Sequence, residues 1–283
     1  MTVAEAIRAA TERLSATSDT ARLDAELLMA HALAVSRSDV LVHRMNDAAP
    51  AEFHRLIERR EQFEPVAYIT GHQEFFGRSF KVTRDTLIPR ADSETIVEAA
   101  LEVLGDPAYV TEGILDLGTG TGALLLSVLA ERPGVRGFGI DISAPAVAVA
   151  RENSRILGLH DRVTFETASW HDLGFQHSSG WKDSTGLYDL VIANPPYVEI
   201  DAPLDKDVKD YEPASALFAG KDGLDEYRAI IPELGNLLAH DGAAVLEIGH
   251  TQAQAVTKLA ENAGFSVEIR NDLANRPRCA ILR

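Results

Sequence analysis

The sequence predicts an α/β protein with a seven-stranded, mostly parallel sheet covered by helices on both faces, preceded by a small helical bundle. Three observations support this. Short β-branched or apolar segments alternate with helical patterns from residue 113 onward, a glycine-rich turn follows the first segment, and only a short link joins the last two. A length of 283 residues allows one large or two modest domains, and 46% hydrophobic with 25% charged residues is ordinary for a globular chain.

Residues 1–62 are predicted to form the helical bundle, because apolar residues recur there at helical spacing in three segments. The second segment is expected to begin at Ser18 or Asp19 as a helix cap, and the third at Pro50. The apolar residues of these segments are Val3, Ile7, Leu14, Leu23, Leu27, Leu28, Phe53, Leu56 and Ile57. This unit is expected to fold around its own apolar core.

Residues 63–90 are predicted to be a connector with a β-hairpin. The pattern turns to β from Pro65 to Pro89, and the segments QEFF and RSFKVT flank Gly77 as a hairpin. Residues 91–283 then form the α/β domain.

The α/β domain contains seven predicted strands, with helices such as 144–157 and 224–238 between most of them. The strands are 113–117, 135–140, 162–166, 188–193, 243–248, 265–269 and 278–282. Residues 271–277 are too few for a helical crossover, so the last two strands are expected to pair antiparallel. Residues 178–186 are expected to be a polar loop.

Composition excludes several classes of protein. A net charge of −16 disfavours a nucleic-acid polymer as partner, because phosphate backbones are repelled by such a surface. No apolar run approaches the ~20 residues of a membrane span, and the N-terminus lacks a signal-peptide pattern, so a cytoplasmic protein is expected. The one cysteine, Cys279, can form neither an internal disulfide nor a cysteine metal cluster, and is expected to be buried. No metal site is predicted.

A glycine-rich turn joins the first predicted strand to a helix that begins at Ala123. Ligands of open parallel sheets bind beyond the carboxyl ends of the strands, and glycines there let the backbone approach a cofactor. The G-x-G-x-G spacing differs from the dinucleotide G-x-G-x-x-G. The predicted cofactor residues of this turn are Gly118, Thr119, Gly120, Thr121 and Gly122.

Asp141 ends the next predicted strand, where a carboxylate can accept hydrogen bonds from both ribose hydroxyls. This indicates an adenosine-bearing ligand. The alternative is that Asp141 caps the helix that starts near Ser143. Between a nicotinamide dinucleotide and S-adenosylmethionine the glycine spacing favours the second without deciding.

The segment Asn194-Pro195-Pro196-Tyr197 follows the strand YDLVIA. Asn194 and Pro195 each precede a proline and are biased to extended geometry, so the chain leaves the strand as a stiff hook. The Asn194 side-chain oxygen and the Pro195 carbonyl can converge as acceptors on one NH₂ group, and Tyr197 offers a flat face to a planar group. These residues are the predicted catalytic and substrate-binding hook.

An amide or aromatic-amine nitrogen is a poor nucleophile because its lone pair is delocalised. Two acceptors on its N–H bonds favour a more pyramidal nitrogen as positive charge develops, which stabilises the transition state more than the ground state. Alignment of this nitrogen with an electrophilic methyl group further lowers the barrier, and no separate general base is required. The hook therefore predicts N-methylation of a planar amino group.

With these motifs the chain resembles a class I S-adenosylmethionine-dependent methyltransferase with a Rossmann-like fold, and more narrowly the release factor glutamine methyltransferase family, the HemK or PrmC proteins. The blocks that carry the resemblance span most of the chain: PVAYITG, EFFGRSFKV, LIPRADSE, DLGTGTG, NPPY, YEPASALFAGKDGLDEYR and EIGHTQ. The resemblance implies methylation of the glutamine side-chain nitrogen in the Gly-Gly-Gln motif of peptide chain release factors. Two blocks depart from the family pattern: residues 89–94 are PRADSE where PRPDTE is usual, and DLANRPR lacks a common glycine.

The resemblance also implies residue roles. Gly118–Gly122 match the cofactor loop, Asp141 the ribose-binding acid, and Trp170 a position beside the adenine. Asn194–Tyr197 match the glutamine-binding hook, with Asn194 also close to the cofactor.

Two alternatives remain open. The hook would also serve a methyltransferase that acts on an exocyclic amino group of DNA adenine or RNA guanine, although residues 198–212 carry six acids and two lysines. A non-catalytic S-adenosylmethionine-binding module is the alternative of another class. A further hypothesis is that residues 1–62 contact the protein substrate, because residues 1–60 hold eight arginines and nine acids whereas the remainder is strongly acidic.

Overall fold

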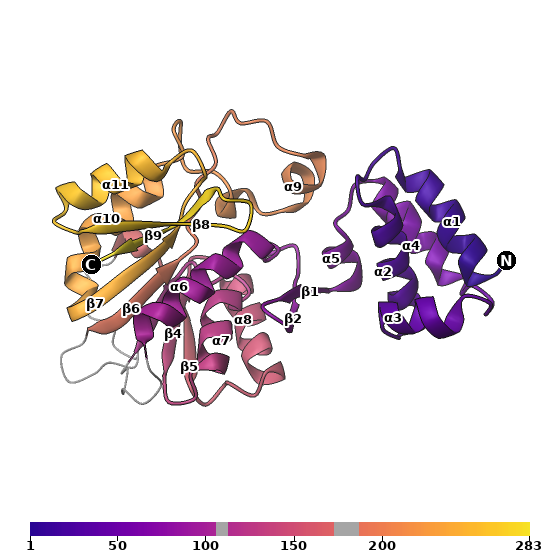
Figure 1. Cartoon of the computed structure of the whole chain (residues 1–283), viewed down its shortest axis with the longest axis horizontal. Coiled ribbons are helices and arrows are strands. Elements are labelled where there is room, and N and C mark those ends of the chain that lie inside the picture. Colours follow the sequence, from indigo (N-terminus) through magenta and orange to yellow (C-terminus); the bar gives the residue numbers. More distant parts are fainter. Residues whose placement is uncertain (106–112, 173–186) are drawn as a thin grey trace. The chain divides into compact units, whose positions relative to one another are not determined.

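The computed structural model describes residues 1–105, 113–172 and 187–283 and contains two compact units (Figure 1). The first comprises Met1–His72 and Leu204–Glu212, and the second Gln73–Pro203 and Pro213–Arg283. The helical unit thus extends past the expected 1–62 and includes a segment from far along the chain. The polar loop expected at 178–186 lies outside the described residues.

The first unit is a bundle of helices around an apolar core that includes Leu14, Leu28, Met29, Phe53 and Ile57. Its elements are α1 (Val3–Leu14), α2 (Ala21–Leu33), α3 (Arg37–Asp39), the π-helix η1 (Val40–Arg44), α4 (Glu52–Glu61), α5 (Val66–Thr70) and α9 (Lys206–Tyr211). The predicted bundle is present, with α4 starting two residues after Pro50.

Two details of the predicted α2 are wrong. The helix begins at Ala21 with Thr20 at its N-cap, whereas the Ser18 hydroxyl binds the side chain of Asp24 at 2.8 Å. Leu23 and Leu27 are also 40% and 37% exposed, although their spacing predicted a buried stripe. The inward face instead carries the buried residues Asp24, Ala25, Leu28 and Met29. A polar side chain occupies the core face because it has hydrogen-bond partners there, which periodicity alone does not show.

The predicted connector contains the expected hairpin and an unexpected helix. Strands β1 (His72–Phe75) and β2 (Arg78–Lys81) form a two-stranded sheet. Phe76 and Gly77 have φ of 49° and 68°, as a tight two-residue hairpin turn requires. The prediction of β pattern from Pro65 is wrong, because the helix α5 follows this proline, which sits at its N-cap.

The second unit is built on a seven-stranded sheet of order β5-β4-β3-β6-β7-β9-β8. Its strands are β3 (Ile114–Leu117), β4 (Gly137–Asp141), β5 (Val163–Thr167), β6 (Tyr188–Ala193), β7 (Leu238–Glu247), β8 (Val267–Asn271) and β9 (Pro277–Leu282). The first five pair in parallel, and β9 pairs antiparallel with both β7 and β8. The predicted fold class is confirmed, including the antiparallel final strand.

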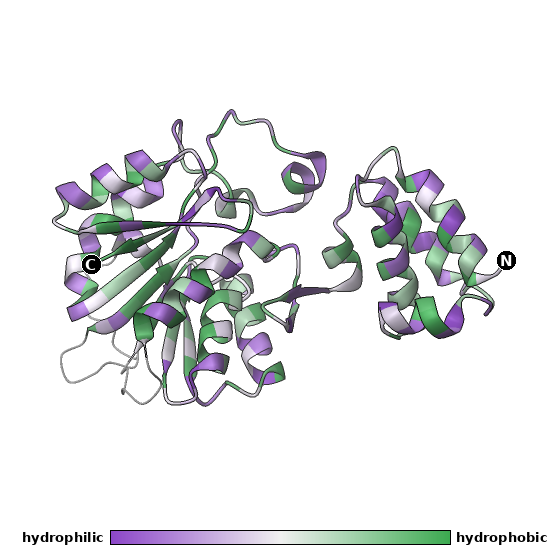
Figure 2. Cartoon of the chain, in the orientation of Figure 1, coloured by the Kyte–Doolittle hydropathy of each residue, from purple (hydrophilic) through white to green (hydrophobic). Residues whose placement is uncertain are grey.

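Apolar side chains cover both faces of this sheet, and β6 and β7 are coloured hydrophobic over most of their length in Figure 2. Alternate residues of β3 show the division: Ile114 packs with α6 (Glu94–Leu104), α7 (Ala123–Glu131) and α8 (Ala144–Ile156), whereas Leu115 and Leu117 pack with α10 (Asp225–Leu237) and α11 (Ala253–Asn262). Cys279 of β9 is fully buried, as expected. Among the described residues no helix combines the length and apolar character needed to cross a membrane.

Candidate active site

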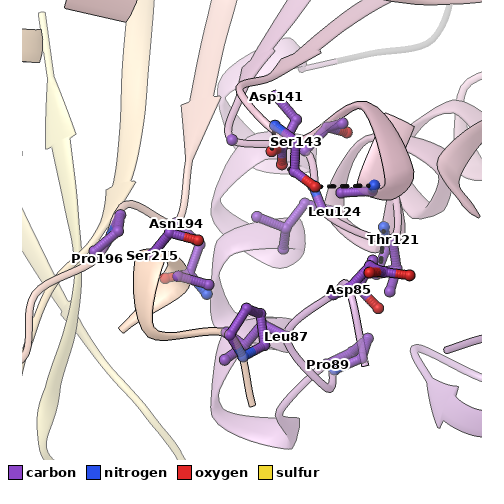
Figure 3. A pocket seen from close by; sticks show the side chains of 18 of the residues that line it. Asp85, Leu87, Pro89, Thr121, Leu124, Asp141, Ser143, Asn194, Pro196 and Ser215 are labelled. Atoms are coloured by element: carbon purple, nitrogen blue, oxygen red, sulfur yellow. Dashed lines mark hydrogen bonds between the residues drawn. The ribbon is translucent and has the colours of Figure 1, made fainter. Parts of the chain in front are cut away.

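A pocket opens at the edge of the sheet where the parallel strands β3, β4 and β6 end (Figure 3). It encloses about 840 Å³ of empty space, part of it open to solvent, which is within the usual size of a small-molecule site. All its lining residues belong to the second unit. The sequence-predicted residues that line it are Gly118, Thr119, Gly120, Thr121, Asp141, Trp170, Asn194 and Pro196. Gly122, Pro195 and Tyr197 are not among its lining residues.

The glycine loop connects β3 to the N-terminus of α7. Gly118 has a φ of +75°, and a Cβ added there would lie 3.0 Å from the Cζ3 atom of Trp170. A glycine is therefore required for two reasons, the left-handed backbone and the aromatic ring packed against it. Asn153 of α8, buried completely, donates from Nδ2 to the Thr121 carbonyl at 2.9 Å and to the Lys81 carbonyl at 3.0 Å. Asn153 thus ties the loop to the hairpin, a role that the sequence did not reveal.

Asp141 is oriented by the loop and by its own neighbours. Its Oδ2 accepts from the Gly120 amide at 2.9 Å, and its Oδ1 accepts from the Ser143 amide at 2.8 Å. Burial raises the pKa of Asp141, while the two backbone donors lower it. The N-cap of α8 is Ser143, whose hydroxyl accepts from the Ala146 amide at 3.2 Å, so the alternative of Asp141 as the cap is wrong.

Asp116 of β3 lies beneath the same loop and is 1% exposed. Its Oδ2 accepts from the Thr119 hydroxyl at 2.6 Å, while its Oδ1 has no hydrogen-bond partner among the described residues. Burial raises the pKa of Asp116 to about 7. This carboxyl group anchors the loop and would titrate near neutral pH.

Trp170 forms a wall of the pocket and is held from outside it. Its Nε1 donates to Glu226 Oε2 at 2.7 Å, and His171 Nε2 lies 3.1 Å from the same oxygen. Glu226 is in the first turn of α10, more than fifty residues away in sequence. Glu226 was not predicted from the sequence, because only the tertiary fold brings α10 to Trp170, which follows β5.

The hook lies where β6 ends, with Pro195 and Pro196 buried. Asn194 faces the pocket, and its Nδ2 donates to the hydroxyl of Ser93 at 3.5 Å, at the upper limit of a hydrogen bond. The amide nitrogen thus lies on the Ser93 side of the group, and the amide oxygen on the opposite side.

The hydroxyl and the carbonyl of Tyr197 are both held by residues from other parts of the second unit. Its hydroxyl donates to Glu247 Oε1 at 3.1 Å, Arg278 Nη1 lies 3.5 Å from the same hydroxyl, and its carbonyl accepts from Gln252 Nε2 at 3.0 Å. Burial raises the pKa of Tyr197, so the phenol is neutral. These contacts fasten the end of the hook to β7, β9 and α11.

Several pocket residues were not predicted. Ile142, next to Asp141, is 64% exposed in the pocket, an unusual place for a large apolar side chain unless a ligand covers it. Others come from the hairpin strand β1, from the chain after the hairpin, and from the segment around η4 (Ala214–Ala216). These are Phe75, Asp85, Thr86, Leu87, Pro89, Arg90, Ser93, Pro213, Ser215 and Ala216. The motifs LIPRADSE and YEPASALFAG contain most of them, but nothing in their local pattern shows that they meet.

Comparison with known proteins agrees with this geometry. Residues 5–71 match the PrmC N-terminal domain, and residues 111–261 match a methyltransferase domain. Release factor glutamine methyltransferase from Rhodospirillum rubrum is 41% identical over 93% of this chain and 78% of its own length. The proteins of the same name from Cereibacter sphaeroides and Moorella thermoacetica are 39% and 41% identical, each over at least 97% of both chains. On these matches along nearly its whole length, the chain belongs to the release factor glutamine methyltransferase family.

Proposed function

We propose that the protein transfers a methyl group from S-adenosylmethionine to the side-chain amide nitrogen of the glutamine in the Gly-Gly-Gln motif of peptide chain release factors. The observation that carries this is the shared pocket, in which the glycine loop and Asp141 lie together with Asn194 and Pro196. The names of the relatives supply the substrate class. The products are the methylated glutamine and S-adenosylhomocysteine.

In this proposal the glycine loop and Asp141 hold the cofactor. The carboxylate of Asp141 already accepts two backbone N–H groups, and its remaining lone pairs accept the ribose hydroxyls. Trp170 and the exposed Ile142 provide apolar surface for the adenine ring. The remainder of the pocket, next to Asn194, then receives the acceptor side chain.

Asn194 and Pro195 act on the acceptor nitrogen. The Asn194 side-chain oxygen accepts one amide N–H, and the Pro195 carbonyl, adjacent to the pocket-lining Pro196, accepts the other. As the bond between nitrogen and the methyl carbon forms, the bond from the methyl carbon to sulfur breaks and its electron pair stays on sulfur. The nitrogen then loses one proton to solvent. Tyr197 takes part by holding the hook.

A protein substrate is favoured over nucleic acid because the chain carries a net charge of −16, which opposes a phosphate backbone. We further propose that the helical unit contacts the release factor, as the match of residues 5–71 to a dedicated domain of this family supports. A cytoplasmic location is part of the same proposal, because the relatives are named for release factors, which act in translation.

The test is to incubate purified protein with methyl-labelled S-adenosylmethionine and, separately, unmodified release factor and duplex DNA, then map the label. We expect label on the glutamine of the Gly-Gly-Gln motif only. Label on an adenine amino group would instead establish the exocyclic-amino alternative, and cofactor binding without labelling of either acceptor would favour a binding module.

Asn194→Ala tests the hook directly. Loss of the acceptor oxygen should lower kcat by about 100-fold, as removal of a transition-state hydrogen-bonding group does in other enzymes, while the fold persists. Steady-state kinetics with a thermal melt measures both. A variant that melts normally and turns over at the wild-type rate would contradict the role given to Asn194.

A further inference from the structure

The pocket has three corners, and the proposed function occupies two of them. In Figure 3 Asp141 lies at one corner, Asn194 at the second and Asp85 at the third. The sulfonium sulfur of S-adenosylmethionine also carries three groups, which are the methyl group, the ribose end and the amino-acid end. With the ribose at Asp141 and the methyl group facing Asn194, the corner at Asp85 is left for the amino-acid end.

The amino-acid end is a zwitterion, with an ammonium group and a carboxylate on the same carbon atom. Both charges lose part of their hydration inside a pocket, so each requires a partner of opposite charge or hydrogen-bonding groups there. Among the described residues that line the pocket, the charged ones are Asp85, Arg90 and Asp141. Because Asp141 is used for the ribose, one acid and one base are left for the two charges of the zwitterion.

Asp85 lies in a turn that fixes the position of its carboxylate. Its backbone amide donates to the Thr83 hydroxyl at 3.2 Å, and the same hydroxyl donates to Asp85 Oδ2 at 3.2 Å. The next amide along the chain, that of Thr86, donates to the Thr83 carbonyl at 3.1 Å, and Thr86 is buried. A carboxylate has about four acceptor positions and Thr83 uses one of them, so Asp85 can also accept N–H bonds from an ammonium group.

The segment 85–90 is held in place relative to the glycine loop. It follows strand β2, whose last residue, Lys81, donates its amide to Asn153 Oδ1 at 2.8 Å. Asn153 Nδ2 donates in turn to the Thr121 carbonyl of the loop at 2.9 Å. Ile88, inside the segment, is buried. The charged residues of the segment are therefore presented to the same pocket as the loop, on a backbone that is anchored on both sides of Asp85.

We propose that Asp85 and Arg90 bind the amino-acid end of the cofactor, with Asp85 at the ammonium group and Arg90 at the carboxylate. The planar guanidinium of an arginine can donate two parallel N–H bonds to a carboxylate, and a carboxylate accepts the N–H bonds of an ammonium group. This assignment rests on the proposed function, because it takes Asp141 as the ribose-binding acid and Asn194 as the neighbour of the methyl group.

Binding of cofactor analogues in the absence of an acceptor tests this assignment. Calorimetry compares S-adenosylhomocysteine, which has the amino-acid end, with methylthioadenosine, which lacks it. We expect Asp85→Asn and Arg90→Gln each to weaken binding of S-adenosylhomocysteine about tenfold or more, the scale of one lost bond between charged groups. Both variants should bind methylthioadenosine within about threefold of wild type.

Arg84→Gln is the matched control, because Arg84 is exposed, directly precedes Asp85 and is not among the residues that line the pocket. This variant should bind both ligands like wild type. Two further analogues separate the two roles. S-adenosylhomocysteine without its carboxylate should bind equally to Arg90→Gln and wild type, and S-adenosylhomocysteine without its amino group should bind equally to Asp85→Asn and wild type.

An unchanged affinity for S-adenosylhomocysteine in D85N or R90Q would overturn the role of that residue. Equal losses for S-adenosylhomocysteine and methylthioadenosine would overturn it as well, because they would show a general disturbance of the pocket. Wild-type protein that binds S-adenosylhomocysteine but does not label release factor would overturn the proposed function and leave the binding result standing. The two failures are therefore distinguishable.

Discussion

At the scale of single residues, the two acids beside the glycine loop differ in what surrounds them. Asp141 is bonded by two backbone amides at the rim of the pocket, whereas Asp116 is 1% exposed and accepts one hydroxyl. The sequence pointed to Asp141 through its place at a strand end. Nothing in the sequence indicates that the pKa of Asp116 is raised to about 7, because this shift depends on how closely the loop buries the carboxyl group.

Asp116 predicts a pH-dependent stability. Burial raises its pKa to about 7 in the folded protein, above the ordinary value of 3.8. A raised folded pKa contributes stability that is fully present below pH ~4 and is lost as the pH rises through ~7. Asp116→Asn, which is neutral at every pH, should therefore be more stable than wild type at pH 8, by up to about 4 kcal/mol.

Urea unfolding at pH 5 and pH 8 measures this difference. The exposed Asp161, next to His160, supplies the control Asp161→Asn, which should show no such gain. A loss of stability in D116N that is equal at both pH values would contradict the prediction that the buried carboxylate of Asp116 destabilises the wild-type protein at pH 8.

Glu226 predicts an effect on cofactor binding from outside the pocket. Its hydrogen bond to the indole of Trp170 keeps the ring against Gly118. Glu226→Ala should weaken S-adenosylhomocysteine binding about tenfold, the scale of one hydrogen bond to a charged group, and Glu226→Gln should weaken it less. Calorimetry reports the affinity. Glu233→Gln on the same helix, whose carboxylate binds only Asn236 among the described residues, should bind like wild type.

At the scale of elements, the long strands and helices follow the predicted pattern because each carries several apolar residues at its own period. Most of the elements that were not predicted are short, although α6 has eleven residues. Helices α3, α5 and α9 have three, five and six residues, too few to display helical spacing. The glycine loop was recognisable for another reason. Its glycines have positive φ, a requirement set by the local backbone and visible in the residue types.

Two glycines offer a sharp comparison, Gly118 in the glycine loop and Gly134 between α7 and β4. At Gly118, φ is +75° and a Cβ would lie 3.0 Å from the Trp170 ring, whereas a Cβ at Gly134 would meet nothing within 4 Å. Gly118→Ala should lower stability by about 1–3 kcal/mol and abolish measurable cofactor binding, because backbone strain and the displaced ring add. Gly134→Ala should leave both unchanged in thermal melts and calorimetry. Normal cofactor affinity in G118A would show that the loop tolerates a different backbone.

At the scale of the whole molecule, the N-terminal unit includes a segment that follows the hook. In α9, the Tyr211 hydroxyl donates to the Gln62 carbonyl at 2.8 Å, and Lys206 Nζ lies 4.4 Å from the centre of the Phe63 ring. The acidic segment 198–212 is therefore divided between the two units, and its charge belongs only in part to the unit that holds the pocket.

The arginines of residues 1–60 are mostly engaged within their own unit. Six of the eight pair with acids there: Arg13, Arg22, Arg37, Arg44, Arg59 and Arg60. Arg8 and Arg55 have no ion pair among the described residues and are exposed. Ion pairs within the unit thus account for most of the arginines that suggested a substrate surface. The proposed contact with the release factor is therefore supported by the match of residues 5–71 to a domain of this family, and not by these arginines.

Removal of the bundle tests that contact. A chain that begins at residue 73 retains every pocket-lining residue and should bind S-adenosylhomocysteine within about threefold of the full-length protein. Its kcat/KM for release factor should fall about tenfold or more, because the docking unit is gone. Tyr211→Phe, which removes the hydrogen bond to Gln62, controls for the loss of α9 contacts and should remain near wild type. An unchanged kcat/KM in the shortened chain would contradict substrate contact by the bundle.

The order of the strands along the chain, the glycine loop and the proline hook were all accessible from sequence, because periodicity, backbone conformation and the missing N–H of proline are properties of neighbouring residues. The register of β6 beside β7 was not, and it alone brings Asn194 to Glu247. The same holds for Glu226 behind Trp170, and for the segment Leu204–Glu212 in the N-terminal unit. These contacts join residues far apart in the chain, and their energy comes from burial and hydrogen bonding that exist only once the fold has formed.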